Sequence, residues 1–461
     1  MSHVAIVGGG ISGLVAAYRL RQRLGPEARV TLIEQADRLG GKLRTVDLDG
    51  VPTDVGAEAF VLRNPAAVDL VTELGLADRL VHPELASATI RAGGSIVPLP
   101  KRTFLGVPAG ADSVRDVLSA DSVARVAAES SLPPLRLADD EDVSVAEVLA
   151  DRFDRELVDH LVEPLLGGVY AGRAERLGLR ATMPALVAAV AETGSFTAAV
   201  DRMMPVRSGP AAPVFGAVRG GMAVLVAELA ARADADVRLG VTTRALARTA
   251  TGWRLELGSV PHPEFLDADA VVLAVPPPAA RRLLTDTSPA AAGAYAGIAV
   301  GSMAVVSMVL PADVTLPAAS GVLLAVGERH RDGTPFTAKA FTYTSRKWGG
   351  ERVRLRASVG RVGEEQTLRR DEDALLADVL ADLAELSGVT AKPDAWTVTK
   401  WGGGLPQYGV GHTAAVAGIE RAVAELPGLA VAGATLRGVG IPACVDAATA
   451  AADRVVGHLA V

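Results

Sequence analysis

The chain has 461 residues, which is enough for about three domains of ordinary size. Apolar residues make up 49% and charged residues 21%, so the composition excludes a chain that is disordered throughout. Its 46 basic residues are outnumbered by 53 acidic ones, which argues against an electrostatic nucleic-acid binder. The single cysteine, Cys444, excludes an internal disulfide and favours a reducing, cytoplasmic setting. Neither it nor the seven scattered histidines predict a metal site.

The first elements predict a strand, a glycine turn and a helix. Residues 3–7 are a short apolar run, and the helical pattern of residues 14–24 follows Gly-Gly-Gly-Ile-Ser-Gly at 8–13. Gly8, Gly10 and Gly13 fit the three glycine positions of a dinucleotide fingerprint, with Ile11 and Ser12 between them. The alternative is an ordinary strand–helix turn without a ligand.

An acidic residue follows the second predicted strand. The strand at residues 29–33 ends in Glu34 and Gln35, and Glu34 stands about 20 residues beyond the last glycine, where a carboxylate accepts hydrogen bonds from a ribose. An ordinary turn would not require this acid. The sequence therefore favours a nucleotide cofactor.

A second glycine pair comes directly after this acid. The segment 38–45 contains Arg38, Gly40, Gly41, Lys42 and Leu43, in which bare backbone and cations suit a diphosphate. This segment resembles the second FAD-contact motif of the flavin amine oxidase superfamily. Residues 54–60, with Gly56, Ala57 and Glu58, resemble that superfamily's segment beneath the flavin ring. The alternative is a solvated basic loop followed by a glycine turn.

The rest of the chain changes character several times. Helical patterns dominate residues 111–200 and strand patterns dominate residues 298–360. The other predicted elements are a helix at 222–232, an apolar strand at 269–275 closed by three prolines, a helix at 371–386, a strand at 429–432 and a helix at 445–459. The uncharged stretch 287–312 is long enough to span a bilayer, but residues 303–310 within it favour a buried strand.

These patterns predict an α/β protein with a discontinuous Rossmann-like FAD-binding domain, a strand-rich α+β substrate domain and a helical insertion. The expected boundaries are 1–80, 205–270 and 402–461 for the FAD-binding domain, 81–105 and 271–401 for the substrate domain, and 106–204 for the mostly helical insertion.

Four later segments, in order, resemble the oxygen-dependent porphyrinogen oxidases, which comprise protoporphyrinogen oxidase and the bacterial coproporphyrinogen III oxidase. They are Glu-Pro-Leu-Leu-Gly-Gly-Val-Tyr-Ala-Gly at 163–172, residues 176–182, Trp401 with Pro-Gln-Tyr-Gly-Val-Gly-His at 406–412, and Gly-Val-Gly-Ile-Pro at 438–442. The sequence departs from the family at Ala443, where an acid is usual, and at Met183, where a phenylalanine is usual.

The resemblance implies a six-electron oxidation of a porphyrinogen to a porphyrin in haem biosynthesis, with FAD as hydride acceptor, O2 as oxidant and H2O2 as product. Only six of the 46 basic residues are lysines, which leaves 40 arginines, and this bias resembles actinobacterial members, so coproporphyrinogen III is the expected substrate. The alternatives are protoporphyrinogen IX, the substrates of a flavin amine oxidase or carotenoid desaturase, and an FAD-binding protein without turnover.

The resemblance also implies which residues contact the ligands, and it implies no catalytic side chain and no metal. The expected cofactor-binding residues are Gly8, Gly10, Ile11, Ser12, Gly13, Glu34, Gln35, Arg38, Gly40, Gly41, Lys42, Leu43, Gly56, Ala57, Glu58, Val241, Trp401, Gly433, Val439, Gly440 and Ile441. The expected substrate-binding residues are Arg63, Gly168, Tyr170 and Leu323. Core packing is the alternative for Tyr170 and Trp401, and His412 has no catalytic role.

Further basic residues beside these segments could bind propionates, with ordinary surface charge as the alternative for each. They are Arg91, Lys101, Arg102 and Arg173. The expected partners are coproporphyrinogen III and O2, without nucleic acid or an integral membrane segment. Peripheral membrane contact, a ferrochelatase-type pathway partner, and a monomeric or homodimeric state stay open.

Overall fold

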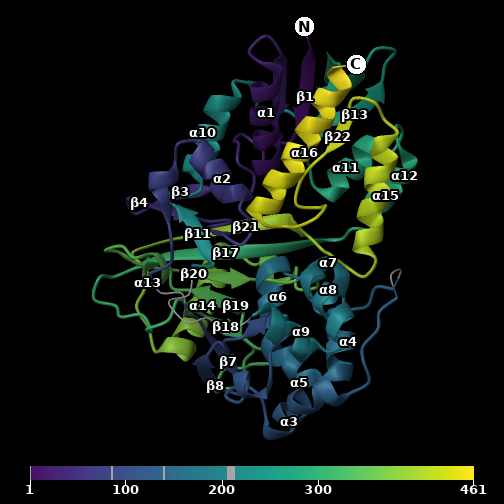
Figure 1. Cartoon of the computed structure of the whole chain (residues 1–461). Helices are drawn as coiled ribbons and strands as arrows, with labels where there is room; N and C mark the ends of the chain where they lie inside the picture. Colours follow the sequence, from purple (N-terminus) through teal and green to yellow (C-terminus); the bar gives the residue numbers. More distant parts are fainter. Residues whose placement is uncertain (1, 85–86, 139–140, 205–212, 461) are drawn as a thin grey trace. The chain divides into compact units, whose positions relative to one another are not determined.

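The computed structural model describes residues 2–84, 87–138, 141–204 and 213–460. Two compact units divide the chain, and each is assembled from separated segments (Figure 1). The first unit comprises Met1–His82, Val214–Val300 and Thr413–Val461, and the second comprises Pro83–Pro213 and Gly301–His412.

The first unit holds both ends of the chain. Its helices are α1 (Ile11–Leu24), α2 (Ala66–Glu73), the 3-10 turn η1 (Ala77–Arg79), α10 (Ala223–Ala233), α11 (Pro277–Leu284), α12 (Pro289–Ala296), α15 (His412–Ala424) and α16 (Ile441–Leu459). Its strands are β1 (His3–Val7), β2 (Arg29–Ile33), β3 (Thr45–Leu48), β4 (Val51–Asp54), β5 (Phe60–Val61), β6 (Leu80–Val81), β11 (Phe215–Val218), β12 (Asp236–Arg238), β13 (Thr243–Arg248), β14 (Trp253–Ser259), β15 (His262–Ala268), β16 (Ala270–Leu273) and β22 (Leu429–Val431).

A parallel five-stranded sheet in the order β12-β2-β1-β16-β22 forms the centre of the first unit. Strand β1 lies in the middle and is almost wholly buried, as expected for an apolar run covered on both faces. Helices α1 and α16, from opposite ends of the sequence, pack against each other beside this sheet (Figure 1). The strand order turns at β1, and such points bind ligands at the carboxyl ends of the strands.

The second unit combines a mixed sheet with a helical part. Its helices are η2 (Ala111–Ser113), α3 (Ala120–Ala128), η3 (Glu129–Ser131), α4 (Val145–Arg152), α5 (Arg155–Leu157), the π-helical turn η4 (Val158–Val162), α6 (Glu163–Tyr170), α7 (Leu179–Thr182), α8 (Pro184–Thr193), α9 (Phe196–Met203), α13 (Thr344–Trp348), η5 (Thr367–Arg369) and α14 (Glu372–Ser387). Its strands are β7 (Thr89–Ala92), β8 (Ser95–Pro98), β9 (Thr103–Phe104), β10 (Val107–Pro108), β17 (Val300–Leu310), β18 (Gly321–Leu324), β19 (Ala338–Thr342), β20 (Val353–Val359) and β21 (Ala395–Pro406).

The seven-stranded sheet of this unit has the order β21-β17-β20-β19-β18-β7-β8. One row across it aligns Val306, Ala357, Phe341 and Val322, all at most 2% exposed, in one core with the apolar side of α14. Because successive side chains of a strand point to opposite faces, the neighbouring row that contains Leu323 faces away from α14. The amphipathic helix predicted at 371–386 is therefore α14, and it covers one face of the sheet.

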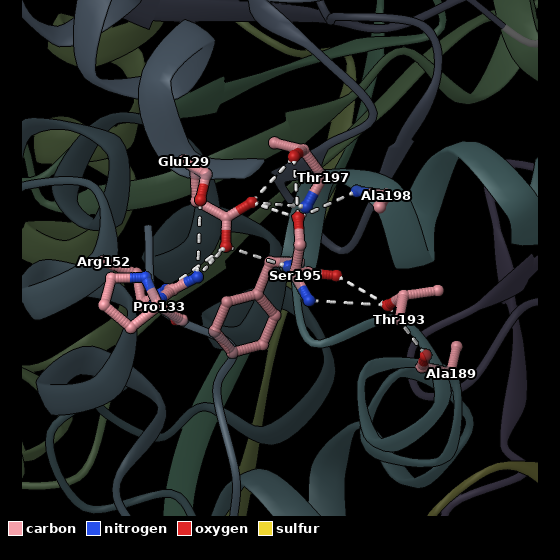
Figure 2. A network of polar contacts seen from close by, with 9 residues as sticks. Glu129, Pro133, Arg152, Ala189, Thr193, Ser195, Thr197 and Ala198 are labelled. Atoms are coloured by element: carbon pink, nitrogen blue, oxygen red, sulfur yellow. Dashed lines mark hydrogen bonds and ion pairs between the residues drawn. The ribbon is translucent and has the colours of Figure 1, made fainter. Parts of the chain in front are cut away.

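A buried carboxylate joins three helices of the second unit (Figure 2). Glu129 pairs with Arg152 at the end of α4, with Oε1 2.8 Å from Nη2. Its Oε2 accepts hydrogen bonds from the hydroxyls of Ser195 (2.6 Å) and Thr197 (2.7 Å), at the N-terminus of α9. An anion is stabilised at a helix N-terminus, and here it also satisfies buried N–H and O–H groups. Glu129 thus ties the ends of η3, α4 and α9 together.

The predicted domain boundaries differ from the two compact units. The apolar strand β16 lies between β1 and β22 in the parallel sheet, so residues 271–299 are part of the first unit and not of the sheet of the second. Residues 402–412 are part of the second unit, and β21, an edge strand of its sheet, extends to Pro406. The segment expected as a separate insertion, 106–204, belongs to the same compact unit as the seven-stranded sheet. The predicted boundary at 204/205 meets residues 205–212, which lie outside the described residues.

The uncharged stretch 287–312 forms helix α12 and strand β17, so the interpretation as a buried strand is confirmed. Within the described part of the chain, no helix is long and apolar enough to cross a membrane.

We expect Glu129→Gln to destabilise the second unit by about 3–5 kcal/mol, because the neutral amide leaves buried Arg152 without its counter-charge. Burial raises the pKa of Glu129, but the hydrogen bonds from Ser195, Thr197 and Arg152 outweigh it and hold the pKa below its usual value. The stabilisation is therefore full above the ordinary carboxyl pKa and is lost as the pH falls through the lowered value. Urea unfolding from pH 7 downwards measures this.

The matched control is Glu192→Gln, whose carboxylate pairs with Arg202 on the surface. Its cost should stay below about 1 kcal/mol, since exposed ion pairs contribute little. Equal unfolding free energies for the two variants would contradict the role assigned to Glu129.

Candidate functional site

The glycine turn after β1 is set by backbone contact. A Cβ atom at Gly13 would lie 1.8 Å from the carbonyl oxygen of Gly8, and one at Gly8 would lie 2.3 Å from that of Ala274, just beyond β16. Gly8 also has φ +106°, which L-residues rarely adopt. Helix α1 then begins after Gly10 without a side-chain cap, so its first N–H groups remain available for an anion.

The second glycine segment lies directly against the first. The N–H of Gly40 donates to the carbonyl of Gly9 over 2.8 Å, and a Cβ at Gly41 would lie 3.1 Å from the Cα of Gly10. The guanidinium of Arg38 folds back onto the carbonyl of Gly41 (2.9 Å). Two segments about 30 residues apart therefore form one bare backbone surface at the end of β1.

Glu34 is held at the end of β2. Its Oε2 accepts the N–H of Gly9 over 2.6 Å, and its Oε1 accepts the N–H of Ala36 over 2.8 Å. An ionised carboxylate has about four acceptor positions, so capacity remains for a ribose diol. Val241 lies next to it, with its N–H donating to the Glu34 carbonyl over 3.0 Å, while Gln35 is exposed.

Lys42 supplies a cation to this surface. Its carbonyl accepts the N–H of Ala57 over 3.1 Å, which aligns the segment Gly56–Glu58 beside it, and Leu43 is buried. Burial lowers the pKa of Lys42, and Cys444 partly offsets this. The described residues place no hydrogen-bond acceptor on its ammonium group, so the environment suits an additional anion.

The last predicted loop closes the same region. Gly433 has φ +125° with open space where a Cβ would stand, and α16 begins after Gly440 without a side-chain cap, one turn earlier than predicted. The hydroxyl of Ser12 lies 3.4 Å from the Cys444 carbonyl, so the first turns of α1 and α16 meet. Two uncapped helix N-termini, a partly buried lysine, bare glycines and an acid at the end of β2 fit an anionic dinucleotide. Val439 and Ile441 lie in this closing segment.

In the second unit, Gly168 lies on α6, where it is exposed and a Cβ would meet nothing within 4 Å. Tyr170, by contrast, is 6% exposed; its ring packs against Tyr408 (5.4 Å between centroids), which stacks on His412 (3.9 Å). Burial raises the pKa of Tyr170 to about 12, so the phenol is neutral. Tyr170 thus packs mainly against Tyr408, whereas Gly168 leaves room for a ligand.

The expected cofactor-binding and substrate-binding residues fall largely into different units. All expected cofactor-binding residues lie in the first unit except Trp401, which is in β21 of the second. All expected substrate-binding residues lie in the second unit except Arg63, an exposed residue of the first. Leu323, on the sheet face away from α14, is only partly buried.

Three of the further basic candidates have acidic partners within the second unit. Arg91 pairs with Glu328 over 2.8 Å and is 9% exposed, and Arg102 pairs with Asp201. Arg173 pairs with Glu364 and with Glu163. Structural ion pairing describes these three better than propionate binding, and Lys101 is simply exposed.

Sequence reasoning gave no role to Gln407 or Lys339. Lys339 is 4% exposed on β19, with its Nζ 3.0 Å from the Gly360 carbonyl, and burial lowers its pKa to about 7. Gln407 donates its side-chain amide to the Tyr170 carbonyl over 2.7 Å. The environments of both residues arise from contacts between segments that are distant in the sequence. Gln407 has one local signal, its position within the motif at 406–412.

Residues 11–456 match the family model of the flavin containing amine oxidoreductases. The chain belongs to this family. Its cofactor is therefore a flavin, and the protein is an oxidoreductase of mixed α/β architecture.

Curated relatives within this family match the chain over nearly its whole length and their own. It is 41% identical to a Mycobacterium leprae protein named coproporphyrinogen III oxidase, over 99% of this chain and 98% of the relative. The protein of that name from Mycobacterium tuberculosis is 42% identical over 98% and 97%. A solved structure of a candidate protoporphyrinogen oxidase from Exiguobacterium is 30% identical, with a TM-score of 0.86 over 99% of this chain and 98% of that one. The resemblance to the porphyrinogen oxidases is thus confirmed.

We expect Gly13→Ala to abolish flavin binding, because the new Cβ would collide with the rigid backbone at Gly8 and displace the start of α1. The purified variant should be colourless, and absorbance near the flavin bands measures it. Gly457→Ala on α16, where a Cβ meets nothing within 4 Å, is the control and should retain flavin. A yellow, stoichiometrically loaded Gly13→Ala protein would contradict this placement of the cofactor.

Proposed function

We propose that the protein is an FAD-dependent coproporphyrinogen III oxidase, which converts coproporphyrinogen III to coproporphyrin III with O2. The observation that carries the proposal is the 41–42% identity, over nearly the whole chain, to enzymes of that name. The arrangement of the glycine segments, Glu34 and Lys42 supports FAD as the flavin, because a dinucleotide uses both a diphosphate surface and a ribose acceptor.

The proposed reaction removes six electrons and six protons from the porphyrinogen. Three O2 molecules take them up and become three H2O2, so atoms and electrons balance. A bound flavin would accept the hydride, and O2 would then reoxidise the reduced flavin. The chain itself has to bind the cofactor, hold a methylene bridge in place and exclude water, none of which requires a protein nucleophile.

For the substrate we assign Gly168, Tyr170, Leu323 and Arg63. The open space at Gly168 and the partly buried Leu323 support an apolar surface for the tetrapyrrole. The neutral phenol of Tyr170 supports a packing contact rather than acid–base chemistry. Arg63 is an exposed guanidinium of the type that binds a carboxylate. We also propose that Trp401 contacts the cofactor. The single cysteine supports a reducing, cytoplasmic setting for the protein.

Protoporphyrinogen IX is the second candidate substrate. The Exiguobacterium protein carries that activity in its name, and a protoporphyrinogen oxidase of Arabidopsis thaliana is 26% identical over 99% of this chain. The higher identity to the mycobacterial coproporphyrinogen III oxidases favours coproporphyrinogen III.

The test prepares both porphyrinogens anaerobically, adds the flavin-loaded protein and air, and records porphyrin fluorescence. We expect faster coproporphyrin formation than with buffer, with coproporphyrinogen III preferred in kcat/KM. Preference for protoporphyrinogen IX would select the second candidate. Acceleration of neither, with oxidation of an amine instead, would overturn the porphyrinogen assignment.

Gly168→Leu should raise KM for the porphyrinogen by on the order of tenfold or more, because the side chain would fill the open space over α6. Steady-state rates at several substrate concentrations measure it. Gly293→Leu, at an exposed position of α12 that is equally open, is the matched control and should leave KM unchanged. Equal KM values for both variants would remove Gly168 from the substrate site.

A further inference from the structure

Helix α6 ends in an unusual turn. Its last residue is Tyr170, and Ala171 follows in the left-handed conformation (φ +48°, ψ +29°), which glycine normally occupies. The N–H of Ala171 donates to the Gly167 carbonyl over 3.0 Å. A non-glycine residue persists in this conformation only when its surroundings enforce it.

Gln407, just beyond β21, supplies such enforcement. Its Nε2 donates to the Tyr170 carbonyl over 2.7 Å and to the Leu405 carbonyl over 3.1 Å. The last carbonyls of a helix have no partner within the helix, so the amide of Gln407 satisfies one of them. The carbonyl of Ala171 is held in turn by the N–H of Val362 over 2.9 Å.

Two glycines make the room that the Gln407 amide occupies. A Cβ at Gly172 would lie 2.4 Å from its Oε1, and a Cβ at Gly301 would lie 2.8 Å from its Nε2. Neither glycine has a positive φ, so backbone freedom does not explain them. They instead fit a need for space at this side chain, from two segments that are about 130 residues apart in the sequence.

We propose that Gln407 is a positioning residue for the reaction: its side-chain amide fixes the turn at Tyr170–Gly172 and so holds the Gly168 face of α6 in place for the porphyrinogen. The inference rests on the proposed function, which assigns Gly168 to the substrate. Gln407 itself touches the backbone of the turn and acts through it. Its loss therefore affects substrate binding, whereas the flavin surface of the first unit stays intact.

The experiment compares Gln407→Leu and Gln407→Glu in the flavin-loaded protein with coproporphyrinogen III. Both should raise KM on the order of tenfold, the scale of one lost hydrogen bond, with kcat within about twofold and flavin content unchanged. Glutamate keeps the shape of glutamine but, when ionised, cannot donate to the Tyr170 carbonyl. If Gln407 merely fills space, Gln407→Glu will have the KM of the unaltered protein, and the proposal fails.

Gln366→Leu is the matched control, since Gln366 is exposed at the start of η5; it should leave KM unchanged. Gly172→Ala provides an independent route, because its Cβ would displace the Gln407 amide without altering that residue. It should reproduce the rise in KM, and the double variant Gly172→Ala/Gln407→Leu should be no worse than the more affected single one. Additive effects would show that the two residues act separately and would overturn the proposal.

The failure of the proposed function is distinguishable from the failure of this inference. In the first case the unaltered protein oxidises no porphyrinogen at all. In the second it does, and the Gln407 variants share its KM.

Discussion

The contact that most of the first unit depends on is the approach of Gly13 to the carbonyl of Gly8, so close that even a methyl group has no room. It brings α1 down onto the end of β1, which directs the first N–H groups of the helix across the carboxyl edge of the parallel sheet. The same closeness leaves Gly9 able to donate to Glu34 and to accept from Gly40. One steric constraint thus places the helix terminus, the acid and the second glycine segment around a common point.

Both ends of the chain are needed to complete this region. Helix α16, the last element of the sequence, packs against α1, the first helix. Gly440 stands directly before its first turn, and Cys444 in that turn lies near Lys42. Lys42 is only partly exposed and burial lowers its pKa, so on the proposed placement an anionic cofactor would stabilise the folded unit on binding. On the same placement, flavin binding and the docking of the C-terminal helix would be linked in free energy.

Local sequence patterns predict much of this region, but they predict little of the pairing between distant segments. The glycine turn, Glu34 and α14 were predictable because each depends on residues close together in sequence. Strand β16 was assigned to the wrong unit, since a short apolar run fits any buried sheet and its partners β1 and β22 lie far away in the chain. The pairing of Arg91 with Glu328, and of Gln407 with Tyr170, spans more than 230 residues and leaves no local signal.

These internal pairings bear on how an acidic protein can hold a substrate with four carboxylates. The net charge is −7, so the overall field opposes the approach of an anion. Arg91, Arg102 and Arg173 already have carboxylate partners, and an arginine whose fork is occupied gains little from a second carboxylate. These three arginines therefore contribute little, and the tetrapyrrole would depend more on apolar contact over surfaces such as Gly168 and Leu323. The shape of the α6 turn then contributes directly to affinity, because it determines which apolar surface the porphyrinogen meets, and the amide of Gln407 holds the end of that turn.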